Sequence, residues 1–159
     1  MKLLLSLLAM LALAASASAQ VPAGSGTLSG PETLKIQRCA KGRGNPSVAV
    51  VLNADGTFTI GAAYAGTSTT AGRVTTLSLD TNSRNTLETA LEANASNACG
   101  TPVTLTSLAI TQSQLKINKR GDRAKLQLKA SGTGSSADGS GSGKYRYKAT
   151  GAWQAATPI

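Results

Sequence analysis

A succession of short β-favouring runs, beginning at Glu32, is the feature that most constrains how this chain can fold. The runs are rich in Val, Thr, Ile and Leu, and residues that favour turns, mainly Gly, Asn and Asp, separate them. Residues 53–56 have turn chemistry between strands predicted at 47–52 and 57–64. The first strand is predicted from Leu34 to near Cys39, and the fourth at 73–79. The pattern indicates a β-rich domain that starts at Glu32.

The second half of the chain shows the clearest strand register. Residues 119–122 form a predicted turn, on either side of which apolar and polar residues alternate. In this register Leu115 and Leu126 face inward, whereas Lys116 and Lys125 face outward. The strands predicted in this half lie at 103–110, 114–118, 123–130 and 144–150.

Residues 80–100 have a helical pattern instead. Asn85 and Glu88 have the spacing of a capping box, and Ser83 is an alternative N-cap. The apolar stripe is narrow and consists of Leu87, Leu91, Ala95 and Ala98. A helix of this kind is expected to lie on a sheet and to end before Gly100.

Two segments have compositions that argue against regular structure. Residues 20–31 are rich in Gly, Ser and Pro, and we expect a flexible leader there. Residues 131–143 form a Gly/Ser tract that we expect to be mobile. After this tract, Tyr145 and Tyr147 are expected to face the core, and Trp153 is expected either to cap the open end of the sheet or to stand at a cavity mouth.

Residues 1–19 have the three parts of a secretory signal peptide. Lys2 is the positive n-region, an apolar stretch follows, and small residues precede a cleavage site near Ala19/Gln20. The apolar stretch is too short to span a bilayer, and no later stretch reaches the length of a transmembrane helix. We therefore expect a periplasmic or secreted protein without a transmembrane segment.

The predicted export determines how the two cysteines are interpreted. In an oxidising compartment an isolated pair is expected to form a disulfide, so Cys39 and Cys99 should be bonded. A redox site would more typically show a Cys-x-x-Cys spacing. The predicted role of this bridge is structural.

Together these patterns predict an α+β domain that is mainly β and spans residues 32–157. We expect a single curved antiparallel sheet of about seven strands, with one amphipathic helix packed on it between the fourth and fifth strands. A closed or half-open barrel is compatible with this pattern. The Cys39–Cys99 bridge would fasten the end of the helix to the first strand.

Positive charge is the strongest indication of function. Sixteen Lys and Arg stand against seven Asp and Glu, for a formal net charge of +9. On the last strands the cations alternate with inward residues and would form one basic face if these strands are neighbours. The predicted polyanion-binding residues are Lys116, Arg120, Arg123, Lys125, Lys129, Lys144, Arg146 and Lys148. The alternative is a solvated face whose lysines only prevent edge-to-edge aggregation.

The composition argues against an enzyme. The chain has no His, and its few acids are scattered, so we expect no catalytic residues, no metal site and no cofactor. We expect a monomeric, non-catalytic exported binding module of the bacterial envelope that meets an anionic component or polyanion. One alternative is a carrier of a lipid or other apolar small molecule in a β-cavity. Another is a secreted inhibitor or interaction protein that uses loops 41–46 and 131–143.

Overall fold

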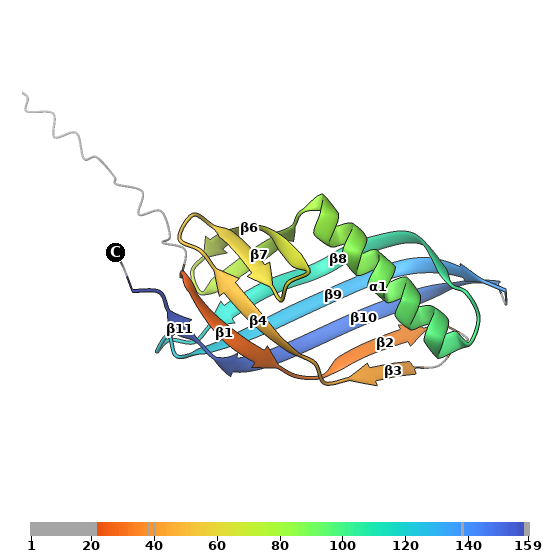
Figure 1. Ribbon diagram of the computed structural model, residues 1–159, viewed down its shortest axis with the longest axis horizontal. Coiled ribbons are helices and arrows are strands. Elements are labelled where there is room, and N and C mark those ends of the chain that lie inside the picture. Colours follow the sequence, from red (N-terminus) through yellow and green to blue (C-terminus); the bar gives the residue numbers. More distant parts are fainter. Residues whose placement is uncertain (1–21, 38, 40, 138, 158–159) are drawn as a thin grey trace, which may run out of the picture.

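A computed structural model describes residues 22–37, 39, 41–137 and 139–157, and these residues form a mainly β fold with one helix (Figure 1). The helix is α1 (Thr81–Cys99). The strands are β1 (Gly24–Ser29), β2 (Glu32–Ile36), β3 (Lys41–Gly44), β4 (Ser47–Leu52), β5 (Thr57–Ile60), β6 (Tyr64–Ala71), β7 (Val74–Leu79), β8 (Thr104–Ile117), β9 (Arg123–Ser136), β10 (Gly139–Ala152) and β11 (Gln154–Ala155). The predicted signal peptide, residues 1–19, lies outside the described residues.

The strands form one antiparallel sheet that closes on itself. Its order is β11-β1-β4-β5-β6-β7-β8-β9-β10-β2-β3, and β1 also pairs with β10 through Ser29 and Thr150. This pairing makes a ring of eight strands, β1 and β4 to β10. The predicted curved antiparallel sheet with one packed helix is confirmed, and the sheet is a closed barrel with more strands than the seven expected.

The first four strands are two halves of one long hairpin. Gly24 pairs with Leu52 in the β1–β4 half and Glu32 pairs with Gly44 in the β2–β3 half, and the register does not change between the halves. Pro31 and Pro46 interrupt the ladder in the middle because proline has no backbone N–H to donate. The β1–β4 half belongs to the barrel wall, and the β2–β3 half extends beyond it alongside β10 (Figure 1).

The prediction of a flexible leader at 20–31 is wrong for the part that the structure describes. β1 lies between β4 and β11, and Leu28 is fully buried. The glycines that suggested flexibility allow close approach of the strands: a Cβ at Gly26 would collide with the Ala152 carbonyl oxygen. Residues 20 and 21 lie outside the described residues.

The Gly/Ser tract at 131–143 is also ordered, in contrast to its predicted mobility. β9 and β10 pair in one unbroken register from Arg123 and Ala152 to Ser136 and Gly139. Backbone hydrogen bonds make this ladder, and side chains are not required for it. Asp138, within the tract, lies outside the described residues.

Two strand predictions differ in their boundaries. The strand predicted at 57–64 is two strands, because the chain turns at Gly61 with a φ of 59°. The strands predicted at 103–110 and 114–118 are one, β8, whose pairing with β9 shifts twice through bulges. The predicted register of Leu115 opposite Leu126 is confirmed, and both side chains are fully buried.

The predicted helix is present, and its N-cap is Asp80 rather than Asn85 or Ser83. A side-chain oxygen of Asp80 accepts a hydrogen bond from the Ser83 N–H at 2.7 Å, and this bond lowers the pKa of the Asp80 carboxyl. The Ser83 hydroxyl in turn accepts a hydrogen bond from the Ala65 N–H of β6 at 2.7 Å. Gly100, in the left-handed conformation, ends the helix.

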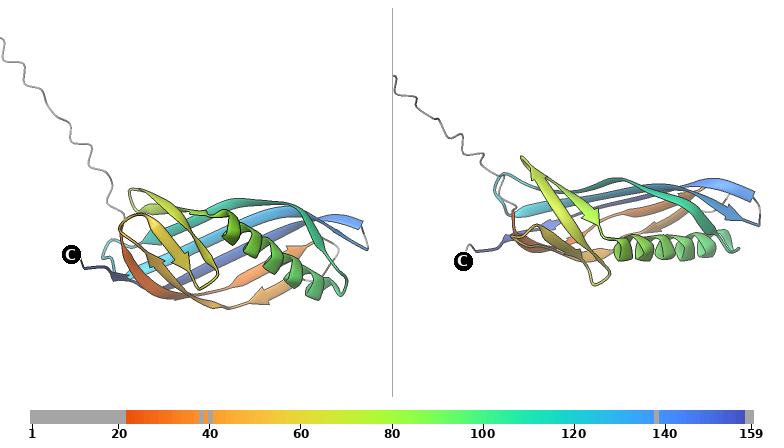
Figure 2. Two further views of the ribbon diagram at one scale, coloured as in Figure 1. Left: turned by 45° about the horizontal axis from the view of Figure 1, so that its top comes forward. Right: turned by 90° about the horizontal axis from the view of Figure 1, so that it is seen from above.

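The helix lies against the extended part of the sheet as a second layer (Figure 2). Its buried side chains are Ser83, Leu87, Leu91 and Ala95; three members of the predicted stripe are buried, and the fourth, Ala98, is half-buried. Glu92 accepts a hydrogen bond from the Leu105 N–H of β8 at 2.7 Å. Among the described residues, no helix is both long enough and apolar enough to cross a membrane.

The predicted disulfide is confirmed between Cys39 and Cys99, whose Cα atoms are 4.9 Å apart. Cys39 follows β2 and Cys99 ends α1. The bond therefore fastens the far end of the helix to the tip of the long β2–β3 hairpin.

A core fills the barrel below the helix. Its members are Leu28, Val50, Leu52, Phe58, Ile60, Leu77, Leu115, Ala124, Leu126, Tyr147, Ala149 and Trp153. Trp153 is only 5% exposed, and its backbone N–H donates a hydrogen bond to the Asp122 carbonyl oxygen at 2.8 Å. Of the two roles predicted for Trp153, the structure supports capping, at the end of the barrel opposite the helix.

Replacement of Gly151 by Ala tests the close approach of β1 and β10. A Cβ at Gly151 would collide with the Thr27 carbonyl oxygen, so we expect a loss of about 1–3 kcal/mol in unfolding free energy. Gly143→Ala is the matched control in the same strand, because its Cβ would meet nothing nearer than 3.9 Å. Urea titration compares the two variants, and equal stability would contradict the role assigned to Gly151.

Removal of the disulfide is expected to destabilise the protein. The bond closes a loop with a sequence separation of 60, which in the chain-entropy model corresponds to about 4 kcal/mol. Cys39→Ser should lower the melting temperature and leave Cys99 open to alkylation. Two alkylatable thiols in the untreated wild-type protein would contradict the bridge.

Candidate functional site

The outer face of β9 and β10 gathers positive charge by strand alternation. Tyr145, Tyr147 and Ala149 of β10 face the barrel interior, so the residues between them face outward. Lys144, Arg146 and Lys148 are the outward residues, and all three are exposed. Half-buried cations of β9 lie beside them on the same face.

These cations surround a groove of about 420 Å³ on the outside of the sheet. The groove crosses β2, β10 and β9 and reaches β8. The residues that line it are Thr33, Lys35, Thr111, Lys129, Ala130, Ser131, Lys144, Tyr145 and Arg146. Four cations and three hydroxyl-bearing Ser and Thr side chains can all donate hydrogen bonds to an anion.

The groove cations stand directly opposite one another across the strands. Lys144 pairs with Lys35 of β2, and Arg146 pairs with Lys129 of β9. Like charges in directly opposed positions destabilise a sheet. β9 and β10 have neighbours on both sides, so protection of an exposed edge does not account for Lys129, Lys144 and Arg146.

The structure adds three cations that the sequence analysis missed. Lys35 pairs with Lys144 and with Lys41 of β3, and Arg43 lies two residues from Lys41 on the same face. Arg43, burial and Lys35, in that order, lower the pKa of the Lys41 ammonium. The alternation of Lys35 with Leu34 indicated an outward side chain, but only the closed sheet places β2 next to β10.

The predicted site residues divide into two groups in the structure. Lys116 and Lys125 pair with each other and, with Lys148, continue the basic face along the strands. Arg120 lies in the β8–β9 turn and Arg123 opens β9, both toward the end away from the helix. At about 3.3 Å per residue, Arg123 is about 20 Å along β9 from Lys129 of the groove. The described acids lie in turns, on α1 or, as Glu32 does, on the inner face.

The described aromatic side chains lie inside the barrel. Tyr147 is 3% exposed, Trp153 is 5% exposed and Phe58 is 1% exposed. Tyr64 and Tyr145 pack against the same core. The basic face therefore lacks the exposed rings on which single-stranded nucleic acid stacks its bases.

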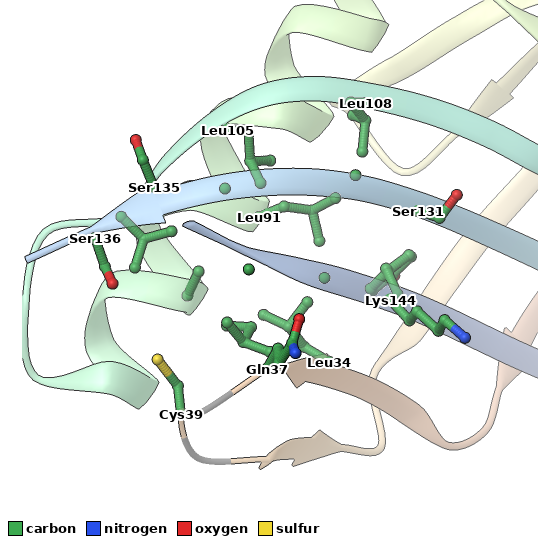
Figure 3. Close-up of a pocket in the computed structure, with 18 of the residues that line it drawn as sticks. Leu34, Gln37, Cys39, Leu91, Leu105, Leu108, Ser131, Ser135, Ser136 and Lys144 are labelled. Carbon is green, nitrogen blue, oxygen red and sulfur yellow. The ribbon is translucent and has the colours of Figure 1, made fainter. Parts of the chain in front are cut away.

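A small cavity of about 40 Å³ lies between α1 and the glycine-rich ends of β9 and β10. Leu34 of β2, Leu91 of α1 and Leu105 of β8 point into it (Figure 3). Its floor contains Gly132, Gly134, Gly141 and Gly143, whose missing side chains leave the space. A cavity of this size holds one or two waters rather than an organic ligand.

A second interior cavity, of about 140 Å³, lies at the helix-covered mouth of the barrel. Glu32 and the tyrosines Tyr64, Tyr145 and Tyr147 line it together with aliphatic side chains. The Tyr145 hydroxyl donates a hydrogen bond to Glu32 Oε1 at 2.8 Å, and the Tyr147 hydroxyl donates to the Pro46 carbonyl oxygen at 3.1 Å. Burial, and after it the Glu32 carboxylate, raises the pKa of all three phenols.

Within the described part of the chain, no three His, Cys, Asp or Glu side chains lie close enough to hold a metal ion. The comparisons with known proteins bring no further information on the site: no family model, curated protein or solved structure matches this chain.

Proposed function

We propose that this protein is a non-catalytic exported binding module of the bacterial envelope that binds an acidic polysaccharide on its basic face. The observation that carries the proposal is the groove in which Lys35 opposes Lys144 and Lys129 opposes Arg146. Such pairs weaken an empty sheet and become favourable when an anion lies between them. A chain of sulfate, phosphate or carboxylate groups could lie across the strands and contact several cations at once.

The surroundings of the groove favour a hydrophilic anionic polymer over nucleic acid and over an anionic membrane surface. Nucleic acid lacks stacking partners because the described rings face inward. A membrane surface would favour exposed apolar side chains beside the cations. Val51 is the large hydrophobic residue that the described chain exposes, at 37%, and it lies on β4 between β1 and β5, away from the groove.

Export is supported by two independent features. Residues 1–19 have the composition of a signal peptide. The Cys39–Cys99 bond is of the kind that persists in an oxidising compartment. We propose a periplasmic or secreted location on these grounds.

The alternative functions have less support. A lipid carrier would need a cavity of at least about 300 Å³, and the two cavities described above, both lined by residues that the structure describes, measure about 40 and 140 Å³. An inhibitor was expected to use loops at 41–46 and 131–143, and these segments consist largely of β3 and the ends of β9 and β10.

Charge removal in the groove tests the proposal. The triple variant Lys35→Gln, Lys144→Gln, Arg146→Gln should bind dextran sulfate at least about tenfold more weakly than the wild type at low salt, because three charge-assisted contacts are lost. All three side chains are exposed, so the melting temperature should not fall. Titration calorimetry at two salt concentrations measures the effect, and neutral dextran should not bind.

A matched variant separates the groove from overall charge. Arg73→Gln, Arg84→Gln, Lys119→Gln removes the same charge from exposed positions outside the groove and should retain most of the affinity. Equal losses in the two variants would overturn the groove as the site. Tighter binding to anionic vesicles than to dextran sulfate would redirect the proposal to a lipid surface.

A further inference from the structure

The mouth cavity of about 140 Å³ is chemically distinct from the outer face. Its walls come from β2, β4, β5, β6, β7, β9, β10 and α1, so it lies at the mouth of the barrel beside the helix. Val48, Ile60 and Leu128 supply part of an aliphatic lining. Among the described residues no Lys or Arg lines the cavity, whereas four line the groove outside.

Glu32 is the acidic residue that lines this cavity. It pairs with Tyr147 across β2 and β10, and its half-buried carboxylate accepts the Tyr145 hydroxyl at 2.8 Å. The described lining of the cavity offers this carboxylate no Lys or Arg as a partner. An anionic guest would be repelled, and a neutral one would remove water from the carboxylate without replacing its hydrogen bonds.

Three phenol-bearing side chains stand beside this acid. Glu32 raises the pKa of Tyr64, Tyr145 and Tyr147 in addition to the larger effect of burial, so its charge is felt at all three. Aromatic rings around a carboxylate, with aliphatic walls, are the chemistry that binds organic ammonium groups. The volume restricts the guest to a small one.

We propose that the Glu32 cavity binds a small organic cation, an ammonium group with a short apolar body. The carboxylate supplies the counter-charge, the three tyrosines supply ring surfaces, and the aliphatic wall covers the apolar body. Leu87 of α1 lines the cavity, and the hydrogen bond from the Ala65 N–H to the Ser83 hydroxyl, one helical turn earlier, ties this part of the helix to β6.

The test compares two probes of the same shape, choline and its neutral carbon isostere 3,3-dimethylbutan-1-ol. Calorimetry or ligand-observed NMR with the wild-type protein should show choline binding at least about tenfold more tightly than the isostere. Glu32→Gln keeps the size of the side chain and an acceptor for Tyr145, and it should abolish this preference. Glu88→Gln, which removes a half-buried acid of α1 outside the cavity, should keep it.

A second variant covers the case in which Glu32→Gln does not fold. Tyr64→Leu removes one ring and should weaken choline binding while leaving the isostere unchanged. Equal binding of both probes, or no binding of either by the wild-type protein, would overturn the proposal. Dextran sulfate binding by the Glu32→Gln variant should match the wild type, so a failure here is distinguishable from a failure of the proposed outer-face function.

Discussion

The pairing of the two ends of the domain holds the rest of the structure in place. β1 and β2 run beside β10 and β11 in one register, from Gly24 opposite Ala155 to Ile36 opposite Gly143. Glycines in both partners allow the backbones to approach, since a side chain at Gly26, Gly30 or Gly151 would strike a carbonyl oxygen across the seam. Without this seam the sheet would be open, the core would lose one wall, and β2 would not lie next to β10.

Closure of the sheet also separates the charges of the protein. Because alternate residues face opposite sides of a strand, β2 places Glu32 inward and Lys35 outward, and β10 places Tyr145 inward and Arg146 outward. The result is a basic exterior over a cavity with a single carboxylate. Two ligands of opposite charge could therefore bind on the two sides of the same few strands.

Local patterns in the sequence predicted much of this fold, and contacts between distant segments explain what they missed. The helix and the Leu115–Leu126 register follow from periodicity, and the disulfide follows from the predicted compartment. β1 was missed because its glycine content indicates flexibility unless a partner strand lies close by. Lys35 was missed as a groove residue because its neighbours, Lys144 and Arg146, are more than a hundred positions away in the chain.

The seam between the first and last strands has a consequence for how the protein folds. The contacts that close the barrel join residues from opposite ends of the domain. Loop-closure entropy therefore opposes these contacts more strongly than it opposes the contacts within any hairpin. The hairpins β4–β5, β6–β7 and β9–β10 can form from local contacts, whereas the closed ring requires β10, which follows all the other barrel strands in the chain. A chain that still lacks β10 has no closed barrel, so the ring cannot close until nearly the whole domain has been synthesised.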